Sequence, residues 1–445
     1  MKYSLMVLGL MLCSSAFAGN PAIPHPFTAD PSLHCWSDGR FYIYGSHDKD
    51  QPKVWDMEDY HVFSSDNLVD WEDHGVVLNN SQTPWDGPFW APDAAEKNGR
   101  YYLYFPEGGH IGVAESDSPT GPFENPHSLY KMPQGYEQAY DPAVFPWKGK
   151  HYLIISERKS LDTPFYPVIF TLKDNMTEIV PGSKVELPPV EGFHEGPFLF
   201  EREGKFYMIG GGYRSLRYWM ADDLFGPWEA KGDFFTGNDT YTIGKTAHGS
   251  VLEYDGKWYL ACHYDVFPDG PYRRTTCIEY LHFNEDGTIQ PVTITRKGID
   301  PILPDGWAGL TLKSKASGKY VSVEQGGRGP FTAKRNRVDQ SSEIYISPIL
   351  KGEVGLVLKA NKKYLCADNY GKDPLKASRD KVDGDWETFT FEQVKDNEYA
   401  IKSKANGKYV RCCKDGNPLI ASSDTVGPEE SFVLSWTTEK PDWWK

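Results

Sequence analysis

"DGRFYIYGS", residues 38–46, is a glycine turn followed by alternating aromatic and aliphatic residues. This pattern is typical of a β-hairpin whose second strand is half-buried. The same pattern returns four times as "NGRYYLYFP" (98–106), "KGKHYLIIS" (148–156), "EGKFYMIGG" (203–211) and "DGKWYLACH" (255–263). The turn glycines therefore recur about every 50 to 60 residues, which is the length of one repeated structural unit.

Each repeat also contains outer-strand segments with Gly and Pro turns. Examples are "SDNLVDWEDHG" (65–75), "SDSPTGPFEN" (116–125) and "ADDLFGPWEAKG" (221–232). A unit of about four short strands without helical periodicity is typical of a propeller blade. The sequence therefore predicts an all-β protein with a five-bladed β-propeller over residues 19–303.

Charged residues recur before the turn glycines of several repeats. Asp30 lies nine positions before its glycine, Asp141 eight, Glu195 nine and His248 eight. The innermost strands of a propeller begin around one central axis, so we expect these side chains to face a common pocket. Each acid alone could be a turn residue or a solvated strand end, because Asp-Pro often opens a turn. Three carboxylates at matching positions favour a functional site.

The composition excludes several classes of protein. The net charge of -15 argues against nucleic acid and against an anionic membrane surface as a partner. Seven cysteines in 445 residues are too few for a disulfide scaffold, although Cys262 and Cys277 could bridge a hairpin. No CxxC motif or His/Cys ladder suggests zinc.

Residues 1–18 have the layout of a cleavable secretory signal. Lys2 precedes an apolar core from Leu5 to Leu12, and "AFA" precedes Gly19. We therefore expect an exported protein, periplasmic, at the cell surface or extracellular; Cys13 leaves a lipid-anchored form as an alternative. No later stretch reaches the roughly 18 apolar residues of a membrane span.

The stretches "ADPS" (29–32), "FWAPD" (89–93), "YDPAVF" (140–145) and "HEGPFLF" (194–200) stand in this order on a five-repeat β chain. In this the chain resembles glycoside hydrolase family 43. The resemblance implies Asp30 as the general base, Glu195 as the general acid, and Asp141 as the residue that orients Glu195 and tunes its pKa. It also implies a structural calcium ion on the axis near His248 of "AHGS", bound largely through water.

The chemistry of glycoside inversion asks for the same groups. One acid protonates the leaving oxygen, and one base across the sugar ring activates water, with their carboxyls about 6.5 to 9.5 Å apart. A third carboxylate near Glu195 is expected to raise its pKa by like-charge repulsion.

Three further residues are candidates for substrate binding. Trp90 could form a sugar platform, or it could be a core indole. In "PYRRTTC" either Arg273 or Arg274 could reach the pocket and bind sugar hydroxyls, the alternative being a solvated hairpin arginine.

A second, threefold repeat fills the rest of the chain. Its members are "SKASGKYVSV" (314–323), "KANKKYLCAD" (359–368) and "SKANGKYVRC" (403–412). Three such units predict a β-trefoil over residues 308–438, and the pattern resembles the fascin-like trefoil group. Such a domain either binds carbohydrate or packs as a structural addition.

We therefore predict a monomeric, inverting exo-glycosidase without organic cofactor that removes terminal α-L-arabinofuranose from a plant polysaccharide. A β-D-xylosidase is the close alternative, and a β-galactosidase of the same fold a more distant one. The alternative from another class is a propeller that binds carbohydrate without cleaving it.

Overall fold

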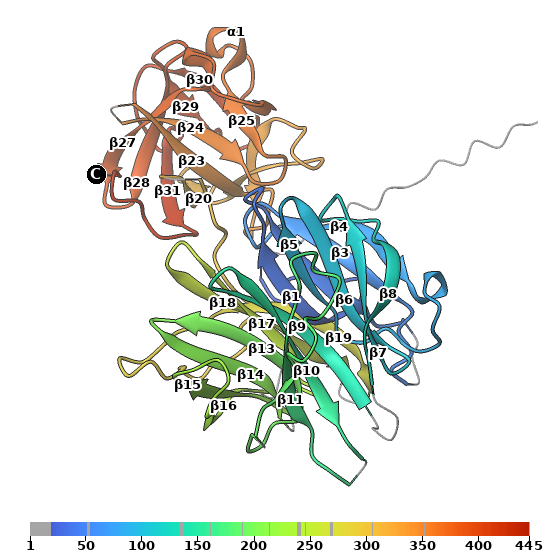
Figure 1. Cartoon of the computed structure of the whole chain (residues 1–445). Coiled ribbons are helices and arrows are strands. Elements are labelled where there is room, and N and C mark those ends of the chain that lie inside the picture. The colour runs from blue at the N-terminus through green and yellow to red at the C-terminus, as the bar shows by residue number, and fades with distance from the viewer. Residues whose placement is uncertain are drawn as a thin grey trace, which may run out of the picture. The chain divides into compact units, whose positions relative to one another are not determined.

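The computed structural model describes residues 19–444 except 51–53, 133–137, 161, 189, 213, 238–241, 245, 268–269, 305 and 351 (Figure 1). The expected signal segment, residues 1–18, lies outside the described residues. Within them, residues 19–300 form one compact unit and residues 301–444 a second. None of their helices is long and apolar enough to cross a membrane.

The first unit consists of five antiparallel sheets in chain order, four of four strands and a last one of three. Within each sheet, consecutive strands pair as neighbours, as expected for propeller blades (Figure 1). The first two sheets comprise β1 (Thr28–Cys35), β2 (Phe41–His47), β3 (Asp59–Ser65), β4 (Glu72–Asn79), β5 (Asp93–Lys97), β6 (Arg100–Glu107), β7 (His110–Ser116) and β8 (Glu124–Lys131), with the short 3₁₀ turn η1 (Asn80–Gln82) between them. The other three comprise β9 (Gln138–Trp147), β10 (Lys150–Arg158), β11 (Tyr166–Thr171), β12 (Val185–Glu186), β13 (Glu195–Arg202), β14 (Lys205–Gly212), β15 (Ser215–Ala221), β16 (Glu229–Thr236), β17 (Gly249–Tyr254), β18 (Lys257–Phe267) and β19 (Gly270–Tyr280). The five-bladed propeller is thus confirmed.

The N-terminal segment completes the fifth sheet. The backbone N–H of Ala22 donates to the carbonyl of Thr276 on β19 at 2.9 Å. The side chain of Asn20 accepts from the N–H of Ile278 at 2.9 Å. The first described residues therefore pair with the last propeller strand, which closes the ring of blades.

Aromatic side chains fill the space between neighbouring sheets. Tyr60, Phe89 and Phe105 are fully buried and pack against one another between the first and second blades. Burial of one such side chain contributes about 1.5–3 kcal/mol to stability. The high aromatic content, 14% of residues, therefore reflects packing between blades as well as any sugar contact.

The second unit is also almost entirely β structure. Its twelve strands are β20 (Ala308–Ser314), β21 (Tyr320–Val323), β22 (Phe331–Arg335), β23 (Glu343–Leu350), β24 (Glu353–Leu358), β25 (Lys363–Cys366), β26 (Lys376–Arg379), β27 (Phe389–Lys395), β28 (Glu398–Ser403), β29 (Tyr409–Arg411), β30 (Ile420–Ser423) and β31 (Ser431–Trp436), with the single turn α1 (Asp368–Gly371) and η2 (Asp385–Glu387). All twelve join in one hydrogen-bonded sheet system around a core of aliphatic side chains with Phe331, Phe389 and Phe432.

Cys262 and Cys277 are free thiols. They lie directly opposite each other on β18 and β19 and are buried, but they form no disulfide. The proposed bridge across the hairpin is therefore absent from this structure.

Candidate active site

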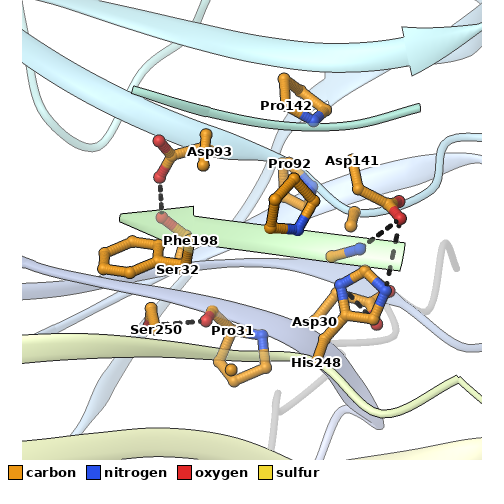
Figure 2. Close-up of a pocket in the computed structure, with 15 residues that line it drawn as sticks. Asp30, Pro31, Ser32, Pro92, Asp93, Asp141, Pro142, Phe198, His248 and Ser250 are labelled. Atoms are coloured by element: carbon orange, nitrogen blue, oxygen red, sulfur yellow. Dashed lines mark hydrogen bonds and ion pairs between the residues drawn. The ribbon is translucent and has the colours of Figure 1, made fainter. Parts of the chain in front are cut away.

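Three consecutive residues at or just before the inner strand of every blade line a channel on the propeller axis (Figure 2). They form three layers of five residues. The first layer is Asp30, Ala91, Asp141, Gly196 and His248; the second is Pro31, Pro92, Pro142, Pro197 and Gly249; the third is Ser32, Asp93, Ala143, Phe198 and Ser250. The five repeats therefore place equivalent residues around one axis.

The backbone has the same irregular conformation at three of these positions. Asp30, Asp141 and Gly196 have φ of 52°, 55° and 63°, and each precedes a proline. Strand pairing is interrupted by a bulge at each of them. Such strained positions recur where a side chain must be aimed at a site.

This alignment corrects the register derived from the turn glycines. The turn between β1 and β2 is longer than the two-residue turns of the other blades. A residue nine positions before the turn glycine in the first blade therefore corresponds to one eight positions before it in the other blades. Asp141 and His248 are equivalent to Asp30, but Glu195 lies one residue earlier, at the position of Trp90. Glu195 therefore enters the site from a different layer.

Gly196 makes room for this arrangement. A Cβ at this residue would lie 3.0 Å from the imidazole of His248, at a φ that side chains rarely adopt. Its N–H donates to Oδ2 of Asp141 at 3.0 Å. A larger residue would require the imidazole of His248 to shift by a few tenths of an ångström and would strain the backbone at this φ.

The three predicted acids converge on the imidazole of His248. Its Nδ1 lies 3.9 Å from Oδ1 of Asp30, and its Nε2 lies 3.6 Å from Oδ2 of Asp141 and 3.9 Å from Oε1 of Glu195. All four residues are less than 10% exposed. The structure thus brings together residues up to 218 positions apart, from Asp30 to His248.

Asp30 is held as a carboxylate. Arg274 donates from Nη1 to its Oδ1 at 2.8 Å, Ser46 donates to its Oδ2 at 2.5 Å, and both partners are buried. Burial alone would raise the pKa of Asp30, but the positive charge of Arg274, followed by that of His248, outweighs burial and lowers the pKa to about 2.

Glu195 has the opposite environment. Its pKa is raised to about 8, chiefly by burial and then by the charge of Asp30, while Arg274 opposes the rise. Its Oε1 is buried and has no hydrogen-bond partner among the described residues. Burial likewise raises the pKa of Asp141 to about 7, although His248 lowers it. The sequence predicts that Asp141 raises the pKa of Glu195 by like-charge repulsion; in the structure desolvation is the main cause, and the like charge that adds to it is Asp30.

A pocket of about 200 Å³ is lined by the three acids and His248. Its walls include Trp55, Met57, Trp90, Gln138, Tyr140, Thr246 and Arg274. Trp90 packs edge-to-face on Tyr140 with ring centroids 5.7 Å apart, so it is a wall residue with its indole N–H bound to the carbonyl of Trp55.

Of the two candidate arginines, only Arg274 lines the pocket. Its guanidinium is engaged by Asp30 and Asp48, so its first role is to hold these carboxylates. Arg273 donates to the carbonyl of Asp50 on the exposed side of the strand and is absent from the pocket lining.

Comparison with known proteins agrees with this geometry. The family model of glycosyl hydrolases family 43 matches residues 18–289, more than half of the chain. The chain belongs to glycoside hydrolase family 43. It is an enzyme of the glycoside hydrolase class.

Named relatives match about three fifths of the family 43 chain. It is 32% identical to a "Xylosidase/arabinosidase" of Bacteroides ovatus, over 62% of this chain and 97% of the relative. It is 32% identical to "Xylosidase/arabinosidase 43A" of Humicola insolens, over 60% and 98%. A solved beta-xylosidase/alpha-arabinofuranosidase from a compost microbial metagenome, described as a calcium-free form with xylotriose, is 33% identical, with a TM-score of 0.54 over 62% of this chain and 97% of that one.

The residues around the channel suit a hydrated calcium ion. His248 lines both the pocket and the channel, and Asp141, Glu195 and His248 place their ligand atoms within 4.8 Å of one another. Ser32, Asp93 and Ser250 add polar side chains to the lining of the same channel. A bound ion would supply positive charge beneath the acids of this family 43 site.

Reasoning from the sequence missed Asp48, Tyr140 and Trp55. Tyr140 and Trp90 stand two residues before a proline, as Glu195 does, and alignment on the X-Pro pairs would have found Tyr140. Asp48 follows β2 without any repeated signal, and its role depends on Arg274, which is 226 residues away.

Proposed function

We propose that this family 43 enzyme is an inverting exo-glycosidase that removes a terminal pentose from plant polysaccharide. The observation that carries the proposal is the opposite state of two buried carboxyls in one pocket: the pKa of Asp30 is lowered to about 2 and that of Glu195 is raised to about 8. Near neutral pH, one is a carboxylate and the other a carboxylic acid, which is the combination required for acid–base hydrolysis.

In this proposal Glu195 donates its proton to the glycosidic oxygen as the bond to the anomeric carbon breaks. Asp30 removes a proton from a water molecule, which attacks the anomeric carbon from the opposite face. Asp141 is a positioning residue, because it holds the N–H of Gly196, the residue after Glu195.

We propose inversion with Asp30 as the base and Glu195 as the acid. Asp30 is nearest to Nδ1 of His248 and Glu195 to Nε2, so the two carboxyls lie near different nitrogens of one imidazole. Inversion needs room for a water molecule and a sugar between the two carboxyls, and this placement is compatible with that requirement.

The size of the pocket supports exo action. Its volume of about 200 Å³ is below the roughly 300–1,000 Å³ typical of sites for drug-sized ligands. A single sugar unit fits such a site better than a stretch of polymer does.

Two pentoses remain candidates for that unit. The sequence favours α-L-arabinofuranose, and β-D-xylose has equal support, since the relatives carry names for both activities. The two sugars present similar hydroxyls, and the indole of Trp90 with the ring of Tyr140 offers either one an apolar wall.

A panel of aryl glycosides tests this function. We expect hydrolysis of 4-nitrophenyl α-L-arabinofuranoside, 4-nitrophenyl β-D-xyloside or both, with proton NMR showing the first-formed sugar as the anomer opposite to the substrate's. Retention of configuration would reject Asp30 as base. Binding of these sugars without any turnover would favour the non-catalytic propeller.

The remaining parts of the proposal concern the other predicted features. We propose that catalysis resides in residues 19–303, and that residues 308–438 form a β-trefoil that holds polymer. The twelve strands divide into four for each sequence repeat, which supports a trefoil. The layout of residues 1–18 supports export of the mature chain, which we propose acts as a monomer.

A further inference from the structure

A second cluster of potential metal ligands lies in the first blade, apart from the acids on the axis. It consists of His47 at the end of β2 and Asp59 and His61 on β3. Ser46 pairs with Tyr60 and Gly45 with His61, so the antiparallel register brings His47 beside Asp59. Asp59 and His61 are two residues apart and share one face of the strand.

The ligand atoms of these three residues lie within 4.8 Å of one another. Nδ1 of His47 is 2.8 Å from Oδ1 of Asp59, and Nε2 of His61 is 3.8 Å from the same oxygen. The two imidazole rings contact each other with centroids 4.7 Å apart. Two nitrogens and one oxygen therefore already face a common point.

A fourth side chain fixes the orientation of His61. Its Nδ1 lies 3.0 Å from Oδ1 of Asp73 on β4. A proton held on Nδ1 by this carboxylate leaves the lone pair of Nε2 directed toward Asp59. A carboxylate behind a histidine is the usual support of a metal-binding imidazole.

The donor set selects the kind of ion. Imidazole nitrogens bind zinc and its first-row neighbours, whereas calcium and magnesium prefer oxygen ligands. The side chains of His47, Asp59 and His61 are 27%, 18% and 11% exposed, so an ion can enter from solvent and keep a water ligand.

We propose that His47, Asp59 and His61 bind one zinc-class divalent cation. The site joins the end of β2 to the start of β3. The segment between these two strands contributes Asp48 and Met57 to the active site. Asp48 adjoins His47 and binds Arg274, while Met57 is two residues before Asp59 and lines the pocket. Metal binding there fixes both ends of this segment; its effect on catalysis rests on the proposed function, whereas the binding itself does not.

Calorimetric titration of the chelator-treated full chain with zinc chloride tests the site, with calcium present in excess to occupy any axial site. We expect one zinc ion per chain and a rise in the melting temperature. Asp73→Asn should weaken zinc binding about 10- to 100-fold, the range for loss of a carboxylate behind a histidine ligand. His47→Gln with His61→Gln should abolish it, and cobalt should give visible absorption bands that the double variant lacks.

His282→Gln is the matched control, because His282 is exposed and lies outside the cluster. It should bind zinc as the parent does. If the double variant fails to fold, the single variant His47→Gln carries the test, since His47 is the most exposed ligand of the three. The proposal is overturned if the chain binds no zinc or if these variants bind zinc with unchanged affinity. It is also overturned if a pentose displaces zinc competitively, because the ion would then lie on Asp141, Glu195 and His248. A failure of glycoside turnover with intact zinc binding would overturn the proposed function and leave this site standing.

Discussion

Nη1 of Arg274 donates to Oδ1 of Asp30 at 2.8 Å, and both side chains are only 3% exposed. The same guanidinium binds Asp48 through Nε and Nη2, so one cation holds two buried carboxylates. Because Arg274 also opposes the rise in the pKa of Glu195, it influences both members of the proposed acid–base pair.

Substitution of Arg274 should therefore alter the pH profile. In Arg274→Gln the pKa of Asp30 should rise by about 1–3 units, since a nearby opposite charge lowers a carboxyl pKa by that amount. Asp30 must be ionised to act as base, so the acid limb of kcat/KM should move to higher pH. Arg274→Lys keeps the charge and should shift the limb less; an equal shift in both variants would contradict this role for the charge.

The leaving group should distinguish Glu195 from Asp30. An aryl oxygen departs with little protonation, whereas a sugar hydroxyl must be protonated as the bond breaks. Glu195→Gln should therefore lower kcat on a natural disaccharide by about 10²–10⁴ and spare much of the rate on an activated aryl glycoside. Asp30→Asn should lower both rates alike. The same leaving-group dependence in the two variants would show that acid and base are wrongly assigned.

The alkaline limb of activity should reflect the protonation of Glu195. Its pKa is raised above that of an ordinary carboxyl, to about 8, so kcat/KM should fall as the pH rises through about 8. Asp141→Asn removes a negative charge from the same cluster, and the limb should move to lower pH. An alkaline limb that does not move in this variant would limit Asp141 to holding Gly196.

Calcium removal should affect stability if the ion binds near His248. Chelation is expected to lower the melting temperature or the rate, and added calcium should restore it, because an ion bound only by the folded chain stabilises that state. His248→Asn should abolish this response. An unchanged melting curve and rate after chelation would identify His248 as a packing residue.

The second unit should be dispensable for small substrates. A chain ending at Pro304 should keep its kcat/KM on aryl glycosides, because all residues of the proposed site lie between Asp30 and Arg274. Its activity on insoluble polymer should fall if residues 308–438 hold that polymer. Failure of the shortened chain to fold, measured by circular dichroism, would favour a structural role for the second unit.

Much of the fold was predictable because its hairpins are local. The turn glycines and the alternating residues after them define strands that pair with their neighbours in sequence, and five such units require a propeller. Asp30 and Asp141 could be found for the same reason, since each opens an Asp-Pro bulge of its own blade.

The sequence also determined which chemical groups are available, namely three acids and a histidine in repeated positions. Only the tertiary structure decided their register and their protonation. The longer turn after β1 adds one residue between Asp30 and its turn glycine, so Glu195 aligns with Trp90 rather than with Asp30. Contacts between blades decide that Arg274 rather than Arg273 lines the pocket and that it binds Asp48. Burial decides the raised pKa of Glu195. Both depend on packing across the propeller, which leaves no local signal in the sequence.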